Sequence, residues 1–179
     1  INLALYKNMP YDPVKDFTPI SLLATLPLAL VIHPSVQATN VKELIAIAHK
    51  RPGELNFASA GNGGPTHLTA EVFKSMTKTS IVHVPYKGNA QALTELISGR
   101  VQMMFSNLLT SMPHVRSGKL RAIAISTAKR SPQAPELPTV AESGVPGFDV
   151  TPWYGVLGPA MLPHAISMRF HNVVADIIY

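Results

Sequence analysis

Residues 55–73 read LNFASAGNGGPTHLTAEVF. The segment begins with the strand-like Leu55–Ser59, passes through three glycines and continues as a helix-like pattern. Pro65 suits the first turn of a helix, and apolar residues recur at helical spacing between Leu68 and Phe73. This order predicts a strand, a tight glycine-rich turn and a helix that begins directly after the turn.

The same alternation of strand-like and helix-like segments extends on both sides of this stretch. Strands are predicted at 28–33, 55–59, 81–85, 101–105 and 120–126, and helices at 41–50, 65–76, 89–98 and 108–116. Connections of helical length between strands imply an α/β fold with a mostly parallel sheet flanked by helices on both faces.

Two regions lie outside this repeating unit. Residues 1–26 are rich in turn signals, and residues 151–179 contain a strand-like segment followed by a helix after Pro163. Five prolines between residues 129 and 152 predict an ordered loop without regular structure. We therefore expect one complete α/β domain at 27–150, with 1–26 and 151–179 as remnants of a second domain in a chain truncated at both ends.

The final predicted helix has an apolar face without an obvious partner. Its members are Ile166, Phe170, Val173, Val174 and Ile177. Such a face favours contact with another surface, and self-association through these apolar ends is one expectation.

Composition excludes several classes of protein. The 179 residues are 46% hydrophobic and 14% charged, which excludes a disordered chain. The absence of cysteine excludes a disulfide scaffold, a thiol nucleophile and cysteine-ligated zinc. The seven histidines form no metal-binding pattern, so we expect neither a metal nor a cofactor.

Charge is concentrated in the middle of the chain. Residues 74–130 contain nine basic residues against one acidic residue, hence a net charge of +8. Such a segment attracts anions, although a solvated lysine-rich face is an equally simple interpretation. Nucleic acid is not an expected partner, because aromatic residues suited to base stacking are scarce.

The segment from Ser59 to His67 is the strongest candidate for a binding site. It lies where a strand ends and a helix begins, at the edge of the sheet where open α/β folds bind ligands. Free N–H groups at the start of a helix suit a carboxylate or a phosphate, and the side chains of Ser59, Thr66 and His67 are expected to add donors. The alternative is a tight turn in which Thr66 serves only the helix end.

Two neighbouring loops are expected to open on the same edge, after the strands that end near 85 and 105. The candidate ligand-binding residues are Ser59, Ala60, Gly61, Asn62, Gly63, Gly64, Thr66, His67, Tyr86, Lys87, Ser106 and Asn107. For Lys87 the alternative is an exposed loop cation, and for Asn107 a helix cap is favoured over direct ligation.

Patterns for nucleotide binding and catalysis are weak. The sixth position of the dinucleotide fingerprint is Thr66 instead of Gly or Ala, and neither a P-loop nor a G-x-S-x-G elbow occurs. The predicted site loops contain no acid that would serve as a general base. A small α/β hydrolase or transferase using Ser59 and His67 is the alternative hypothesis, without an orienting carboxylate.

Several segments together resemble the solute receptors of tripartite tricarboxylate transporters, the Bug-type periplasmic receptors. The matching segments are ALYKNMPYDPVKDF at 4–17, NFASAGNG at 56–63, THL at 66–68, VHVPYKG at 82–88, GKLRA at 118–122, LPTVAESG at 137–144 and WYG at 153–155. The resemblance covers the whole chain.

The resemblance implies a type II periplasmic binding protein, a non-enzymatic receptor whose two α/β domains close on a small di- or tricarboxylate. It implies location in the periplasm and partners in the membrane subunits of the transporter. One ligand carboxylate is expected at the glycine loop, here Ala60 to His67, and the other at a loop of the first domain that this chain lacks.

Two segments depart from the family pattern. The family commonly has Asp-Asn where this chain has Ser106-Asn107, and the lost acid makes an amino-acid ligand less expected. The usual Ala-Gly-Thr-Pro is replaced by residues 160–163, which read AMLP.

Overall fold

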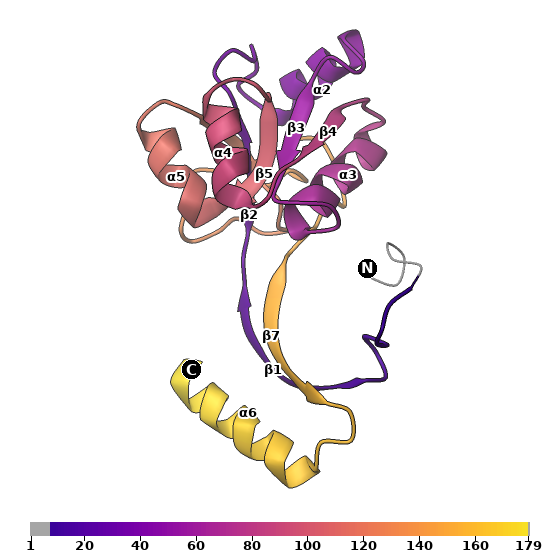
Figure 1. Ribbon diagram of the computed structural model, residues 1–179. Coiled ribbons are helices and arrows are strands. Elements are labelled where there is room, and N and C mark those ends of the chain that lie inside the picture. The colour runs from indigo at the N-terminus through magenta and orange to yellow at the C-terminus, as the bar shows by residue number, and fades with distance from the viewer. Residues whose placement is uncertain (1–7, 179) are drawn as a thin grey trace. The chain divides into compact units, whose positions relative to one another are not determined.

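The computed structural model describes residues 8–178, which divide into two compact units (Figure 1). One unit runs from Leu26 to Thr151, and the other combines residues 8–25 with residues 152–178. The assignment of the second unit to a further domain stays a prediction.

The larger unit alternates strands and helices close to the predicted positions. Its elements are β2 (Leu28–Ile32), α2 (Val41–Lys50), β3 (Asn56–Ser59), α3 (Pro65–Thr77), β4 (Val82–Pro85), α4 (Asn89–Ile97), β5 (Met103–Asn107), α5 (Leu108–Arg116) and β6 (Arg121–Ile125). The predicted α/β class is therefore confirmed.

The five strands form one mixed sheet in the order β4-β3-β5-β2-β6. β3 pairs in parallel with β4 and with β5, whereas β2 pairs antiparallel with β5 and with β6. Four strands thus share one direction, and β2, predicted as the first strand of a parallel series, runs against them. Its sequence does not reveal this, because a strand buried on both faces reads as an apolar run in either direction.

Helices cover both faces of this sheet. On one face, side chains of α2 and α3 pack over Phe57 and Phe105, and on the other α4 and α5 pack over Met104. The first core contains an aromatic cluster in which the Phe105 ring lies 5.8 Å from Phe73 and 6.0 Å from Phe148, centroid to centroid.

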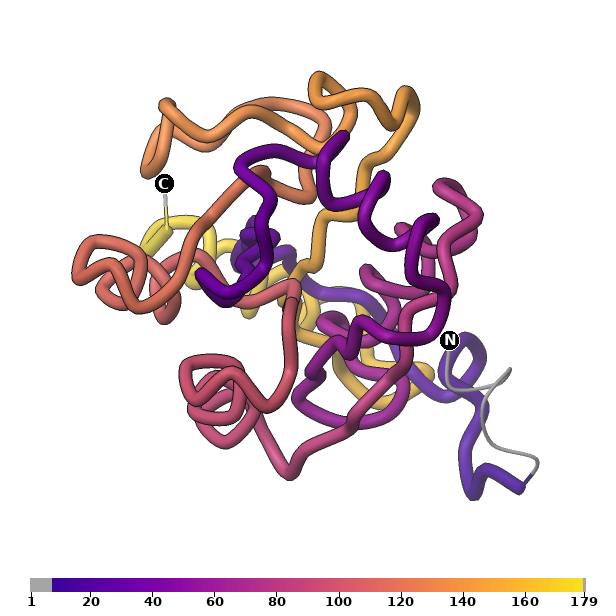
Figure 2. Tube along the Cα trace, turned by 90° about the horizontal axis from the view of Figure 1, so that it is seen from above, coloured from indigo at the N-terminus to yellow at the C-terminus, as the bar shows by residue number. Residues whose placement is uncertain are grey.

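Phe148 belongs to the irregular segment that follows β6, which was predicted to lack regular structure. The segment is fixed by backbone hydrogen bonds, including one from the Val140 N–H to the Ile125 carbonyl at 2.9 Å. Figure 2 shows it running along the outside of the larger unit beside α2, where Gly144 closely approaches Lys42. The proline-rich segment is therefore part of the core.

Two helices begin at the asparagines that the sequence indicates. The Asn40 side chain accepts a hydrogen bond from the Glu43 N–H, and the Asn107 side chain accepts one from the Leu109 N–H, both at 2.9 Å. Each bond satisfies an amide that the helix itself leaves unpaired. The helix-cap interpretation of Asn107 is confirmed.

The smaller unit contains a two-stranded antiparallel ribbon and one helix. β1 (Phe17–Thr25) pairs with β7 (Trp153–Pro159), and α6 spans His164–Ile178. A hydrogen bond of 3.1 Å joins the His171 ring to the Ile20 carbonyl, between α6 and β1.

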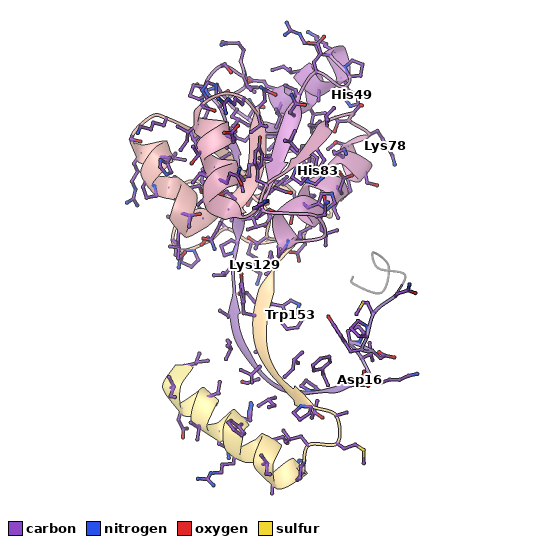
Figure 3. All side chains as sticks on the ribbon, in the orientation of Figure 1. Asp16, His49, Lys78, His83, Lys129 and Trp153 are labelled. Atoms are coloured by element: carbon purple, nitrogen blue, oxygen red, sulfur yellow. The ribbon has the colours of Figure 1, made fainter. Side chains whose placement is uncertain are left out.

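Large apolar side chains remain exposed on this unit. Phe170 is 55% and Ile177 78% exposed on α6, and Figure 3 shows the half-exposed Trp153 on β7. The predicted apolar face is present, and self-association stays a prediction. No described helix has both the length and the apolar character needed to cross a membrane.

We expect Leu44→Ala to lower the free energy of unfolding by about 2–5 kcal/mol, because it opens a cavity in the core between the sheet and α2. Leu44 is fully buried, whereas Leu109 on α5 is 61% exposed. The matched variant Leu109→Ala should change stability by less than about 0.5 kcal/mol. Urea unfolding followed by far-UV circular dichroism measures both, and equal losses would contradict the assigned core.

Candidate functional site

Three loops lie together at one edge of the sheet. β3, β4 and β5 run in the same direction, so their carboxyl ends reach the same edge. The Tyr86 N–H donates to the Ser59 carbonyl at 3.0 Å, which joins the first two loops. The side-chain amide of Asn89 donates to Thr110 Oγ1 at 3.1 Å, which joins the starts of α4 and α5. This arrangement confirms the predicted common edge.

The loop between β3 and α3, residues 59–64, is hereafter the glycine loop. Gly61 and Gly63 have φ angles of +133° and +74°, which side chains with a Cβ rarely adopt. A Cβ at Gly61 would also lie 3.6 Å from the Tyr86 carbonyl oxygen. That distance is an ordinary van der Waals contact, so it is the positive φ angles, and not a lack of space, that favour glycine at both positions.

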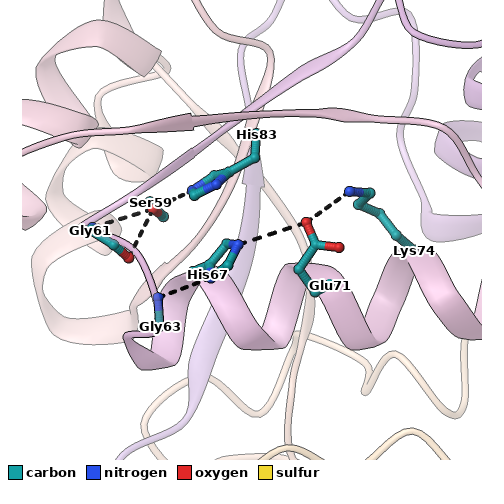
Figure 4. Close-up of polar contacts among 7 residues, drawn as sticks. All are labelled: Ser59, Gly61, Gly63, His67, Glu71, Lys74 and His83. Carbon is teal, nitrogen blue, oxygen red and sulfur yellow. Dashed lines mark hydrogen bonds and ion pairs between the residues drawn. The ribbon is translucent and has the colours of Figure 1, made fainter. Parts of the chain in front are cut away.

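Side chains from the first turn of α3 fold back onto the glycine loop. Thr66 Oγ1 accepts a hydrogen bond from the Ala60 N–H at 2.9 Å, and His67 Nδ1 accepts one from the Gly63 N–H at 3.0 Å (Figure 4). These two side chains were predicted to add donors for a ligand. In the structure both side chains fix the loop, so Thr66 does more than serve the helix end. Their role as donors to a ligand stays a prediction.

Backbone donors remain unused at the start of α3. Within residues 8–178, no hydrogen bond involves the amide N–H of Asn62, Gly64 or Thr66. α3 is thirteen residues long, has no acidic residue in its first turn and begins after Gly64. The positive end of the helix dipole and the free N–H groups together favour an anion.

Two histidines lie beneath the loop, and one of them, His83, is not among the residues predicted from the sequence. His83 of β4 is in register with Phe57 of β3, and their rings stack with centroids 4.7 Å apart. The His67 ring stacks on His83 at 4.0 Å. His83 Nε2 lies 2.6 Å from Ser59 Oγ, which also accepts the Gly61 N–H at 3.2 Å.

The environment of His83 disfavours its protonated form. Burial lowers the pKa of the His83 imidazole below its usual 6.5, and the neighbouring His67 lowers it further. Residues two apart in a strand face the same side, so Phe57, Ser59 and His83 share one face. That alternation is the signal that could have identified His83.

The Ser59 and His67 pair that the hydrolase hypothesis requires is not formed. Ser59 Oγ contacts His83 instead of His67, and Ser59 is fully buried. A nucleophile needs both a positioned base and access to a substrate. The described residues also contain no cluster of three or more histidine, aspartate or glutamate side chains that could hold a metal ion.

The other candidate residues differ in accessibility. Asn62 and Lys87 are exposed, and no ion pair within the described chain involves Lys87. Burial, followed by the charge of Glu95, raises the pKa of the Tyr86 phenol, which therefore stays protonated at neutral pH. Ser106 is fully buried, and its Oγ has no hydrogen-bond partner among the described residues.

We expect Thr66→Val to destabilise the protein by about 1–3 kcal/mol, because the Ala60 N–H loses its acceptor while the side-chain shape is kept. Thr66→Ser retains the hydroxyl and is the control. Amide hydrogen exchange separates the two variants: Ala60 should exchange faster in the valine variant only. Slow exchange at Ala60 in Thr66→Val would show that the contact is dispensable.

The lowered pKa of His83 predicts a pH-dependent stability. The unfolded chain takes up a proton near pH 6.5, above the pKa of folded His83, so the stabilising contribution is complete above pH 6.5 and is lost as pH falls through the folded pKa. Urea unfolding at pH 7.5, 6 and 5 should give a shallower pH dependence in His83→Gln than in the wild type. The exposed His164→Gln is the control, and identical slopes for His83→Gln and the wild type would refute the prediction.

Known proteins match this chain over nearly its whole length. A family described as the tripartite tricarboxylate transporter family receptor matches residues 2–177. Protein BugT of Bordetella pertussis is 38% identical over 159 residues, 89% of this chain and 49% of BugT. The protein from the tcbD-tcbE intergenic region of Pseudomonas sp. strain P51 is 36% identical over 167 residues, 93% of this chain and 50% of that protein.

Solved structures match in fold as well. R. palustris Rpa4515 with adipate is 41% identical with a TM-score of 0.87, over 96% of this chain and 57% of that chain. MatC from Rhodopseudomonas palustris with bound malate is 30% identical with a TM-score of 0.85, over 98% of this chain and 60% of that chain. The periplasmic binding protein BugD is 31% identical with a TM-score of 0.83, over 94% of this chain and 56% of that chain.

This chain spans about half the length of the curated relatives it matches. Within that span, the family match, the identities and the shared fold agree with one another and with the predicted resemblance. The chain belongs to the tripartite tricarboxylate transporter receptor family, whose members are solute-binding receptors and not enzymes.

Proposed function

We propose that this chain forms part of a periplasmic receptor that captures a small di- or tricarboxylate and delivers it to the membrane subunits of a tripartite tricarboxylate transporter. The observation that supports this proposal most directly is the set of unused N–H groups at Asn62, Gly64 and Thr66, at the start of α3. Backbone donors at a helix N-terminus suit an anion with several acceptor oxygens.

The surroundings of these donors also favour a carboxylate. The three loops at this edge, residues 59–67, 86–88 and 106–107, contain no aspartate or glutamate that would repel an anion. Lys87 adds an exposed positive charge to the loop that Tyr86 joins to Ser59. An anion there gains both hydrogen bonds and favourable electrostatics.

We assign different roles to the candidate residues. In this proposal the free amides of Asn62, Gly64 and Thr66 and the side chain of Lys87 face the ligand. The Tyr86 side chain packs against the core beneath α4 and joins the loops through its backbone. The buried side chains of Ser59 and Thr66 act indirectly by fixing the loop.

Two related structures support the ligand class. Rpa4515 is described with adipate and MatC with bound malate, and both molecules are small dicarboxylates. The first of these proteins is 41% identical to this chain. Adipate is therefore a reasonable first probe, although the proposal concerns the class and not this compound.

An NMR titration tests the proposal and detects binding even at millimolar affinity. Adipate added to the ¹⁵N-labelled 179-residue protein should shift the amide resonances of Asn62, Gly64 and Thr66. Adipamide has the same length without the charges and is the matched control, so it should leave them unchanged. Equal responses to both compounds, or shifts confined to residues away from the three loops, would refute carboxylate binding at this site.

Substitution of Gly64 provides the charge test within the same experiment. Gly64 has φ −74°, and a Cβ would lie 3.7 Å from the Gly61 carbonyl, an ordinary contact. Aspartate is also a favourable N-cap residue, so Gly64→Asp should fold. We expect it to weaken adipate binding at least about tenfold through like-charge repulsion, whereas Gly64→Ala should bind like the wild type and Gly64→Asn should lie between them.

A further inference from the structure

The stacked imidazoles of His67 and His83 connect the glycine loop to the sheet beneath it. His67 comes from the first turn of α3 and His83 from β4, with ring centroids 4.0 Å apart and planes inclined by 22°. The His67 side chain is 16% exposed. Figure 4 shows that each ring contacts a different part of the loop: His83 contacts Ser59 at its start, and His67 contacts Gly63 near its end.

The contact with Gly63 determines which nitrogen of His67 carries the proton. The Gly63 N–H donates to His67 Nδ1 at 3.0 Å, and only a ring nitrogen without a proton can accept. Neutral His67 therefore carries its proton on Nε2, which lies 3.8 Å from Glu71 Oε1. A second proton, on Nδ1, would oppose one N–H to another and abolish the hydrogen bond with Gly63.

The contact between His83 and Ser59 does not have this restriction. Ser59 Oγ lies within 3.2 Å of both the Gly61 N–H and the Gly61 carbonyl, so the hydroxyl can accept from or donate to its neighbours. It can pair with either protonation state of His83 Nε2. Of the two rings, therefore, only His67 has a contact with the loop that protonation would break.

We propose that His67 is a positioning residue for the carboxylate site: unprotonated at Nδ1 it holds Gly63 and the free loop amides in place, and protonation of Nδ1 releases the loop and weakens ligand binding. This proposal rests on the proposed function for its effect on binding. The coupling between His67 and the loop is independent of any ligand.

A protonated His67 would also attract an anion, and this attraction opposes the loss of binding that follows from release of the loop. The charged and titratable groups around the rings are Glu71 and Lys74 on α3, besides His83 on β4. Lys74 Nζ lies 2.7 Å from Glu71 Oε1, the oxygen that also faces His67. Glu71 would therefore partly neutralise the added charge, and the attraction that remains is small at a partly solvated site. Loss of the loop conformation removes the donors themselves, so it determines the net effect.

The ligand-free test follows both groups by NMR in the full 179-residue chain. Ring ¹⁵N shifts should show His67 with its proton on Nε2 at pH 8. As the pH is lowered from 8 to 5, the Gly63 amide should shift in step with the His67 ring resonances, and the Asn62, Gly64 and Thr66 amides should follow. A proton on Nδ1 at pH 8, or a titration of His67 that leaves Gly63 unchanged, would overturn the proposal.

Two variants at the same position connect the loop to binding, with adipate as the probe. Asparagine places an oxygen where Nδ1 lies but does not titrate, whereas leucine offers no acceptor. Between pH 8 and pH 5, adipate affinity should fall about tenfold more in the wild type than in His67→Asn, the size expected for one lost hydrogen bond. His67→Leu should bind weakly at both pH values.

The two proteins experience the same titration of adipate itself, so their difference isolates His67. Equal pH dependence in the wild type and His67→Asn would overturn the proposal, as would His67→Leu binding like the wild type at pH 8. No adipate response in any variant, combined with coupled titration of His67 and Gly63, would count against the proposed function and leave the coupling supported.

Discussion

The parallel pairing of β3 with both β4 and β5 constrains the rest of the larger unit. It directs three carboxyl ends toward one edge, and each strand is followed by a helix that starts there. The pairing also fixes the register in which Phe57 lies opposite His83, so the stacked rings follow from the sheet. A shift of one residue would turn His83 to the opposite face and remove its contact with Ser59.

The polar groups of the glycine loop divide into an inner and an outer set. Side-chain acceptors on Ser59, Thr66 and His67 satisfy the amides of Gly61, Ala60 and Gly63, and all these contacts lie in partly buried surroundings. An unpaired amide there would be costly, which explains why each has a partner. The remaining amides have none within the described chain, and a helix start exposes such groups at little cost when solvent or an anion can accept from them. The loop is thus rigid through its side chains and available for binding through its backbone.

Sequence reasoning predicted what depends on local chemistry and missed what depends on pairing. The cap at Asn40, the helix start at Pro65 and the α/β alternation each follow from a few adjacent residues, and all were found. The direction of β2 depends on its antiparallel pairing with β5, in which Leu28 lies opposite Asn107, and no local pattern encodes that pairing. His83 was missed for the same reason, because its partners are 16 and 24 residues away in the chain. The free amides of the loop were predictable in kind, but which ones remain free depends on side-chain contacts visible only in three dimensions.

The bond between Ser59 and His83 illustrates why a short contact is insufficient evidence for catalysis. The 2.6 Å separation of Oγ and Nε2 matches that of a nucleophile and its base. Yet Ser59 is fully buried, and its hydroxyl already accepts the Gly61 N–H. The depressed pKa of His83 arises mainly from burial, which also keeps a substrate away from the hydroxyl. Burial thus keeps the His83 imidazole neutral and the Ser59 hydroxyl out of reach of a substrate, so exposure of the nucleophile, rather than distance or pKa, distinguishes a catalytic pair from a structural one.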